Sequence, residues 1–254
     1  MNLNYREYGS GQPLLILHGL FGSSDNWQSL GKRLSQHFHV YLIDQRNHGR
    51  SGHSNDHTYE LMADDLDEFI QEKDLEDIVL VGHSMGGKTA MTYAQLDDSR
   101  LTKLVIVDIA PKGYPMHHNT IVEGLNAIDL TIEKTRTSCD ARLAEFISDT
   151  VLRQFLLKNL YWEKKSQLEW RFNLYVLTRD MGNILSELPE EHVEIPTLFI
   201  RGDLSNYILE TDYTAIKNQF TSSIIQTIKG VGHWVHAEAP DQFYEMVKDF
   251  TDER

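Results

Sequence analysis

The stretch Ile78-Val-Leu-Val-Gly-His-Ser-Met-Gly-Gly87 decides the fold. Its apolar start is typical of a buried strand, and the pattern G-x-S-x-G follows at once, with a helix predicted over residues 85–96. A sharp turn from strand to helix would project the Ser84 hydroxyl from the edge of a sheet, while the glycines let neighbouring backbone approach closely. Ser84 is therefore the candidate nucleophile.

Strands and helices alternate on both sides of this stretch. Helices are predicted near residues 26–36, 58–73 and 211–218, and from 240 onward. Strands are predicted at LLILHG (14–19), HVYLID (39–44), IVLVG (78–82), KLVIVD (103–108), TLFIRG (197–202) and IIQTIKG (224–230). This alternation predicts an α/β fold with a mostly parallel, twisted sheet and helices on both faces.

The alternation breaks in the middle of the chain. Residues 111–189 are helical in character, with the apolar-periodic segments ARLAEFI and VLRQFLLKNL and no convincing buried strand. We therefore expect a core made of residues 1–110 and 190–254, and a helical cap inserted after the sixth strand. Such a cap would cover the carboxyl ends of the strands, where ligands of α/β proteins bind.

Composition narrows the classes of partner. The 254 residues carry a formal charge of −14, which repels nucleic acid and anionic lipid surfaces. No apolar run is long enough for a membrane span, and the first residues do not resemble a secretory signal. A single cysteine, Cys139, agrees with a reducing compartment. We expect a cytoplasmic monomer or dimer that acts on a small molecule.

The sequence has 12 histidines, and we choose the candidate general base for Ser84 among them by position. His233 follows Gly232 shortly after the last predicted strand, on a loop that can reach back over the sheet, and a histidine titrates near neutrality. His236 is the weaker alternative. No histidine lies in a His-Glu-x-x-His pattern or beside a cysteine set, so neither a metal nor another cofactor is expected.

A serine nucleophile that forms a tetrahedral intermediate also needs donors for the oxyanion. The start of the helix after Ser84 aims the Met85 N–H at developing negative charge. The loop His18-Gly-Leu-Phe-Gly22 follows the first core strand, where this kind of fold places a second donor. We assign that donor to the N–H of Leu20, with Phe21 as the alternative.

The acid has two candidates. Asp203 lies on the loop after TLFIRG, two residues short of the position that is common in such hydrolases, where Ser205 stands instead. Asp108 ends KLVIVD, and a helix and a strand connect it to Ser84, the length of a crossover to a parallel neighbour. Asp108 is favoured, with Ser205 as a neutral support of the triad. Asp44 also ends a strand, but we expect it to pair with Arg46 or cap its loop.

Several blocks, taken together, resemble the YbfF-type esterases of the α/β-hydrolase superfamily. In chain order they are HGLFGSSDNW, DQRNHGRS, GHSMGGK, VDIAP, FLLK with EWRFN, and GHWVHAE. The resemblance implies a helical cap over a Ser-His-Asp site, the aspartate of VDIAP as the acid, and hydrolysis of carboxylic esters, including acyl-CoA thioesters.

The cap supplies candidates for substrate binding. Phe21, Trp170 and Phe172 are expected to contact substrate, although most aromatic residues of the cap would form its own core. Lys88, Arg171 and Arg179 are expected to be structural rather than to bind an anionic leaving group. Two alternatives stay open: a C–C bond hydrolase with a more polar pocket, and a ligand receptor with little turnover. A haloalkane dehalogenase is disfavoured because it needs an aspartate in place of Ser84.

Overall fold

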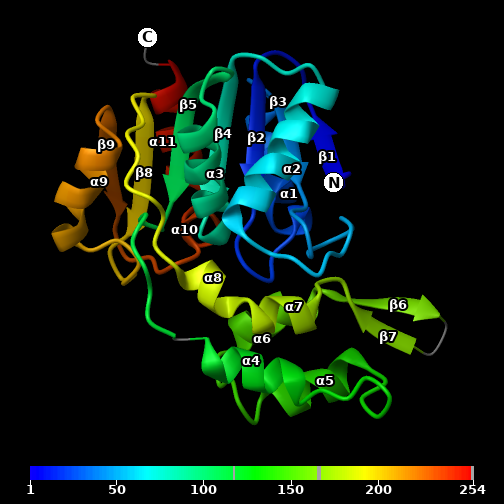
Figure 1. The fold of residues 1–254 in the computed structure, drawn as a ribbon. Helices are drawn as coiled ribbons and strands as arrows, with labels where there is room; N and C mark the ends of the chain where they lie inside the picture. Colours follow the sequence, from blue (N-terminus) through cyan, green and yellow to red (C-terminus); the bar gives the residue numbers. More distant parts are fainter. Residues whose placement is uncertain (117, 165–166, 253–254) are drawn as a thin grey trace.

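The predicted parallel sheet is confirmed by a computed structural model, which describes residues 1–116, 118–164 and 167–252 (Figure 1). Within these residues the main sheet has the strand order β1-β3-β2-β4-β5-β8-β9. Its strands are β1 (Tyr5–Tyr8), β2 (Pro13–Leu17), β3 (His39–Ile43), β4 (Ile78–His83), β5 (Leu101–Val107), β8 (Thr197–Gly202) and β9 (Ser223–Ile228). The first strand, β1, pairs antiparallel with β3, and the other neighbouring strands pair in parallel.

Helices cover both faces of this sheet. They are η1 (Ser24–Trp27), α1 (Gln28–Leu34), α2 (Tyr59–Glu72), α3 (Met85–Leu96), η2 (Glu210–Asp212), α9 (Tyr213–Gln219), α10 (Val235–Glu238) and α11 (Pro240–Asp252). Successive residues of β2 point to opposite sides, as the strand period requires. Leu15 and Leu17 belong to the cluster that contains α2 and α3, whereas Leu14 and Ile16 pack with α1 and α11. None of the described helices is both long and apolar enough to cross a membrane.

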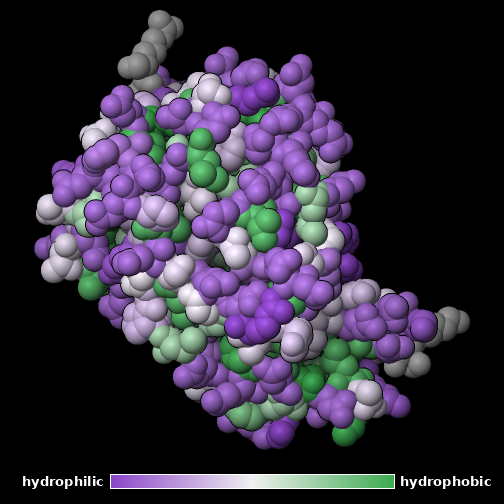
Figure 2. Space-filling view, viewed as in Figure 1, coloured by the Kyte–Doolittle hydropathy of each residue, from purple (hydrophilic) through white to green (hydrophobic). Residues whose placement is uncertain are grey.

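Residues 111–189 form a separate lobe below the sheet (Figure 1). The lobe contains α4 (Asn119–Asn126), α5 (Arg136–Leu143), α6 (Thr150–Leu157), β6 (Leu160–Lys164), β7 (Gln167–Trp170), α7 (Leu174–Arg179) and α8 (Met181–Leu185). Its two ends meet where the N–H of Leu188 donates to the carbonyl of Pro111 over 2.8 Å. The face shown in Figure 2 is largely hydrophilic, with hydrophobic residues on this lobe and in patches over the core. We call residues 111–189 the cap.

The described part of the cap is mostly helical, but it also contains two short strands that the sequence did not indicate. Strands β6 and β7 pair antiparallel as a hairpin, and α6 ends at Leu157 instead of continuing through Leu160. Leu160 and Leu168 are buried, whereas Trp162 is 50% exposed, so the hairpin buries only part of its surface. A strand pair of this kind lacks the continuous apolar run by which a buried strand is found in a sequence.

The predicted place of the insertion also needs correction. The cap follows β5, the fifth strand of the described chain, and not the sixth. In the described chain only β1, β2, β3 and β4 precede β5. The position of the cap relative to the sheet is unaffected, because β5 lies next to β4 and ends at the same edge.

Candidate active site

Ser84 occupies the turn between β4 and α3, with backbone angles of φ 54° and ψ −119°. A positive φ is uncommon outside glycine and stores local strain. A Cβ on Gly82 would lie 2.3 Å from the Gly86 carbonyl oxygen, and one on Gly86 would lie 2.5 Å from that of Leu17. Only glycine fits both positions, so the spacing in G-x-S-x-G follows from backbone packing around the serine.

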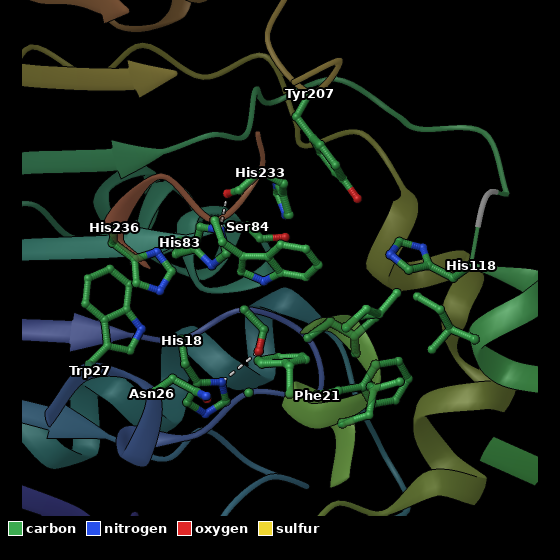
Figure 3. Close-up of a pocket in the computed structure, with 18 residues that line it drawn as sticks. His18, Phe21, Asn26, Trp27, His83, Ser84, His118, Tyr207, His233 and His236 are labelled. Carbon is green, nitrogen blue, oxygen red and sulfur yellow. Dashed lines mark hydrogen bonds between the residues drawn. The ribbon is translucent and has the colours of Figure 1, made fainter. Parts of the chain in front are cut away.

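The half-buried Ser84 lines a pocket of about 220 Å³ between the core and the cap (Figure 3). From the core come the loop 18–22 and residues around His233. From the cap come His118, Ile121, Leu152, Phe155 and Leu156. Most of these cap side chains are apolar, so the pocket suits a hydrocarbon group beside the serine.

His233 and Asp108 are bonded to each other at this pocket. The Nδ1–H of His233 donates to Oδ2 of Asp108 over 2.8 Å, which leaves Nε2 of the same ring as the acceptor. Figure 3 shows the His233 ring next to Ser84. Strand pairing explains how Asp108 comes so close: His83 is opposite Val107, and the Ser84 N–H donates to the Val107 carbonyl over 3.1 Å. Ser84 and Asp108 are therefore adjacent on neighbouring strands.

The Asp108 carboxylate is fully buried, and further donors satisfy it. The N–H of Gly202 donates to Oδ1 over 3.1 Å, and the Ser205 hydroxyl donates to Oδ2, which His233 also contacts. Asp203 points elsewhere, because its Oδ1 accepts the N–H of Gly230 over 2.6 Å. The structure thus brings Ser84, His233, Asp108 and Ser205 together and leaves Asp203 outside the group.

His233 has two further contacts, one to its ring and one to its backbone. Tyr207 stacks on it, with ring centroids 3.9 Å apart and planes 17° from parallel. The Nε2–H of His83 donates to the His233 carbonyl over 2.9 Å. His83 therefore supports the backbone of His233. The stacking of Tyr207 on the His233 ring is a contact that the sequence did not indicate.

His236, the alternative base, is built into the core. Its ring stacks on Trp27 with centroids 3.9 Å apart. Burial, reinforced by the neighbouring His233, lowers the pKa of His236 to about 3. Burial also lowers the pKa of His83 well below its ordinary value, and His236 and His233 add to the effect. Both rings are neutral at physiological pH, and His233 alone of the three contacts Asp108 in the described structure.

The donor loop lies against the serine. A Cβ on Gly19 would come within 3.2 Å of the Ser84 Cβ. Among the residues that the structure describes, the N–H groups of Leu20 and Met85 have no acceptor, whereas the Phe21 N–H donates to Nε2 of His48 over 3.2 Å. Leu20 and Met85 are thus available to a ligand, and the alternative donor Phe21 is already engaged.

Phe21 is fixed on several sides. Its φ is 57°, in the left-handed region that β-carbon-bearing residues rarely adopt. The buried Asn159 of the cap donates through Nδ2 to the Phe21 carbonyl over 2.7 Å, and the ring of Phe172 packs 5.1 Å from that of Phe21. Sequence reasoning missed the roles of His48 and Asn159, because each acts on a residue distant in the chain.

The other candidate substrate contacts take different places. Phe21 lines the pocket. Phe172 packs against Phe21 and is only 1% exposed. Trp170 stacks on Phe172 with ring centroids 5.0 Å apart. Neither Trp170 nor Phe172 lines the pocket. Phe172 instead packs on Phe21, and Trp170 packs on Phe172, because the cap must bury its own apolar surface.

The three cations considered for an anionic leaving group are engaged away from the serine. The ammonium of Lys88 donates to the carbonyls of Lys112 and Ser186, and burial lowers its pKa to about 8. Arg179 pairs with Asp180 over 2.7 Å. The guanidinium of Arg171 lies 4.4 Å from the ring centroid of Tyr161.

Asp44 caps its loop but does not pair with Arg46. It accepts N–H groups from Ser24 over 2.6 Å and Arg50 over 2.9 Å, so it does cap the loop. Arg46 bonds Asp65 instead, over 2.6 Å. In the described part of the chain no cluster of His, Cys, Asp and Glu is arranged to hold a metal ion.

Comparison with known proteins agrees with this geometry. A family model described as the alpha/beta hydrolase fold matches residues 12–135. Esterase YbfF of Escherichia coli (strain K12) is 34% identical, over 95% of this chain and 93% of that protein. The sn-1-specific diacylglycerol lipase ABHD11 of Mus musculus is 36% identical, over 93% of this chain and 80% of that protein.

Solved structures show the same fold. A protein described as a marine microorganism esterase is 42% identical and superimposes with a TM-score of 0.95, with 98% of each chain covered. E-2-(Acetamidomethylene)succinate hydrolase, at 22% identity, has a TM-score of 0.84 over 98% of this chain and 95% of that chain. The second likeness concerns the fold alone.

Proposed function

The chain belongs to the YbfF-type esterases of the α/β-hydrolase superfamily, and from this premise we propose that it cleaves carboxylic esters through an acyl-enzyme on Ser84. It is a hydrolase of the esterase/lipase type. The observation that carries the proposal is the bond between His233 Nδ1 and Asp108 Oδ2, 2.8 Å long, beside a serine on a strained turn.

Acylation starts when Ser84 Oγ attacks the ester carbonyl carbon. His233 Nε2 takes the hydroxyl proton, and buried Asp108 stabilises the imidazolium and keeps the proton on Nδ1. The N–H groups of Leu20 and Met85 bind the oxyanion of the tetrahedral intermediate. As the intermediate collapses, the C–O bond to the alcohol breaks and His233 returns its proton to the leaving oxygen.

Deacylation repeats these steps with water. His233 Nε2 removes a proton from the water as the water oxygen attacks the acyl carbon, and this proton passes to Ser84 Oγ when the C–O bond between Ser84 and the acyl group breaks. The products are a carboxylic acid and an alcohol, and the enzyme returns to its starting state. Ser205 supports this cycle by donating to Asp108, which keeps the carboxylate oriented without adding charge.

The surroundings of the serine favour simple apolar esters. Leu20, Phe21, Leu152 and Leu156 line the pocket, which argues against the more polar site of a C–C bond hydrolase. Acyl-CoA thioesters pass through the same chemistry, with a thiolate as the leaving group. Lys88, however, is engaged by backbone carbonyls, so it offers no anchor for the anionic coenzyme. Oxygen esters are therefore our first choice.

The decisive experiment is a substrate panel with a matched blank. We expect steady-state turnover of p-nitrophenyl esters, lost by at least 10³-fold in Ser84→Ala, because the nucleophile is gone. The control is Ser29→Ala, an exposed serine on α1. Activity that survives in Ser84→Ala would refute the proposal, and ligand binding without turnover of any ester would favour a receptor. Acyl-CoAs in the same panel measure the preference for oxygen or sulfur esters.

A further inference from the structure

A second cavity of about 660 Å³ lies beside the serine pocket. It is formed between α6 of the cap and α10 of the core, and its apolar lining includes Val151, Phe155, Trp234 and Ala237. Val151 is 72% exposed, an apolar side chain that the fold itself does not bury. We call this cavity the α6–α10 groove.

The groove and the serine pocket share a wall. Asn26, Phe155, Trp234 and His236 line both cavities. The rings of Phe155 and Trp234 form the aromatic part of this wall, with centroids 5.8 Å apart and planes inclined by 49°. Phe155 comes from the cap and Trp234 directly follows His233, so the wall stands immediately beside the reacting groups.

The serine pocket is small, so the adjacent α6–α10 groove matters for longer substrates. Its 220 Å³ is below the range of roughly 300–1,000 Å³ that is typical of sites for drug-sized ligands. A short acyl group fits beside Ser84, but a longer chain needs additional space. The groove is the adjoining space with an apolar lining, and half-buried Phe155 and Trp234 separate the two.

We propose that the α6–α10 groove is a second subsite, which takes the far end of a hydrocarbon chain of the ester, and that Phe155 and Trp234 control passage to it. The inference rests on the proposed function, because the near end of the chain must be joined to the carbonyl at Ser84. A chain laid along Val151 and Ala237 removes apolar surface from water, and each buried methylene strengthens binding by about fourfold.

Ala237 allows a test from the groove side. This exposed residue lines the groove but not the serine pocket, so Ala237→Phe places a bulky ring in the groove. We expect the ratio of kcat/KM for p-nitrophenyl decanoate to that for the butyrate to fall at least tenfold. Phe155→Ala removes the wall and should raise the same ratio. Ala141→Phe, at an exposed alanine of α5 that lines neither cavity, is the matched control.

Two series of esters identify which half of the substrate uses the groove. The first varies the acyl chain of p-nitrophenyl esters, and the second varies the alcohol chain of alkyl acetates, followed by acid release. If the variants change the ratio of kcat/KM for long and short chains in one series only, the groove binds that half of the ester. If the ratio changes in both series, the groove accepts either chain. Unchanged ratios in both series, for Ala237→Phe and Phe155→Ala alike, would overturn the inference. Ser84→Ala tests the proposed function separately, because it removes turnover at every chain length.

Discussion

The Asp108 carboxylate combines complete burial with a full set of donors. Gly202, His233 and Ser205 all donate to it, and such charge-assisted bonds are about twice as strong as neutral ones. Its backbone φ of 50° is positive, which marks the position as locally strained. These three donors orient the carboxylate, and Asp108 acts on Ser84 through His233.

We therefore predict that Asp108→Asn lowers kcat by about 10³-fold or more, because an amide cannot stabilise the imidazolium or hold its tautomer. Asp203→Asn should change kcat by less than about threefold, since its side chain bonds the Gly230 N–H, which an amide oxygen also accepts. Initial rates on p-nitrophenyl butyrate, with circular dichroism to verify folding, measure both. The opposite ranking would place the acid at Asp203.

His236 should make the protein sensitive to acid. Its pKa is about 3 in the folded protein and about 6.5 when unfolded, so between these values the unfolded chain binds the extra proton. Stability should therefore fall as the pH drops through this window. In His236→Phe, which keeps an aromatic ring beside Trp27, the slope of unfolding free energy against pH should shrink by up to about 1.4 kcal/mol per pH unit.

Urea titrations at pH 7, 6 and 5 measure this slope. The exposed His192→Gln variant controls for the loss of a histidine as such. Equal slopes for the wild type and His236→Phe would show that His236 takes up its proton equally in both states.

At the scale of elements, the site depends on how the cap docks on the donor loop. The loop after β2 places Leu20 and Phe21 beside Ser84, and the segment between α6 and β6 reaches it through Asn159. His48, on the loop after β3, accepts a hydrogen bond from the Phe21 N–H. Elements of both the core and the cap thus determine where the Leu20 N–H lies.

Asn159→Ala should lower kcat by about tenfold with little change in KM, because a buried carbonyl loses its donor and the donor loop loses its alignment. Asn159 does not line the pocket, so ground-state binding should persist. Steady-state kinetics separate the two constants. Asn126→Ala, an exposed asparagine of α4 that bonds within its own helix, is the control. A raised KM with an unchanged kcat would contradict the positioning role.

At the scale of the whole molecule, core and cap share one interior. A single hydrophobic cluster contains Leu17 and Met85 of the core together with Leu125, Leu156 and Phe172 of the cap. Such a shared cluster couples the two parts energetically, because neither can unfold without exposing apolar surface of the other.

We predict a single cooperative unfolding transition. Denaturant curves followed by far-ultraviolet circular dichroism and by tryptophan fluorescence should coincide, since Trp27 lies in the core and Trp162, Trp170 and Trp234 lie in the cap or beside it. In an Asn126→Ala control both curves should shift together, if at all. Two separated transitions would show that the cap unfolds on its own.

Local pattern and strand order were enough to predict much of the molecule. The turn at Ser84 follows from glycine packing, and the adjacency of Ser84 and Asp108 follows from a crossover between parallel neighbours, so both could be read from the sequence. Local sequence did not show the hairpin β6–β7, the neutral state of buried His236 or the bonds that occupy the Phe21 peptide. These depend on burial and on contacts between distant residues, such as Asn159 and Phe21, which only the docking of the cap on the sheet brings together.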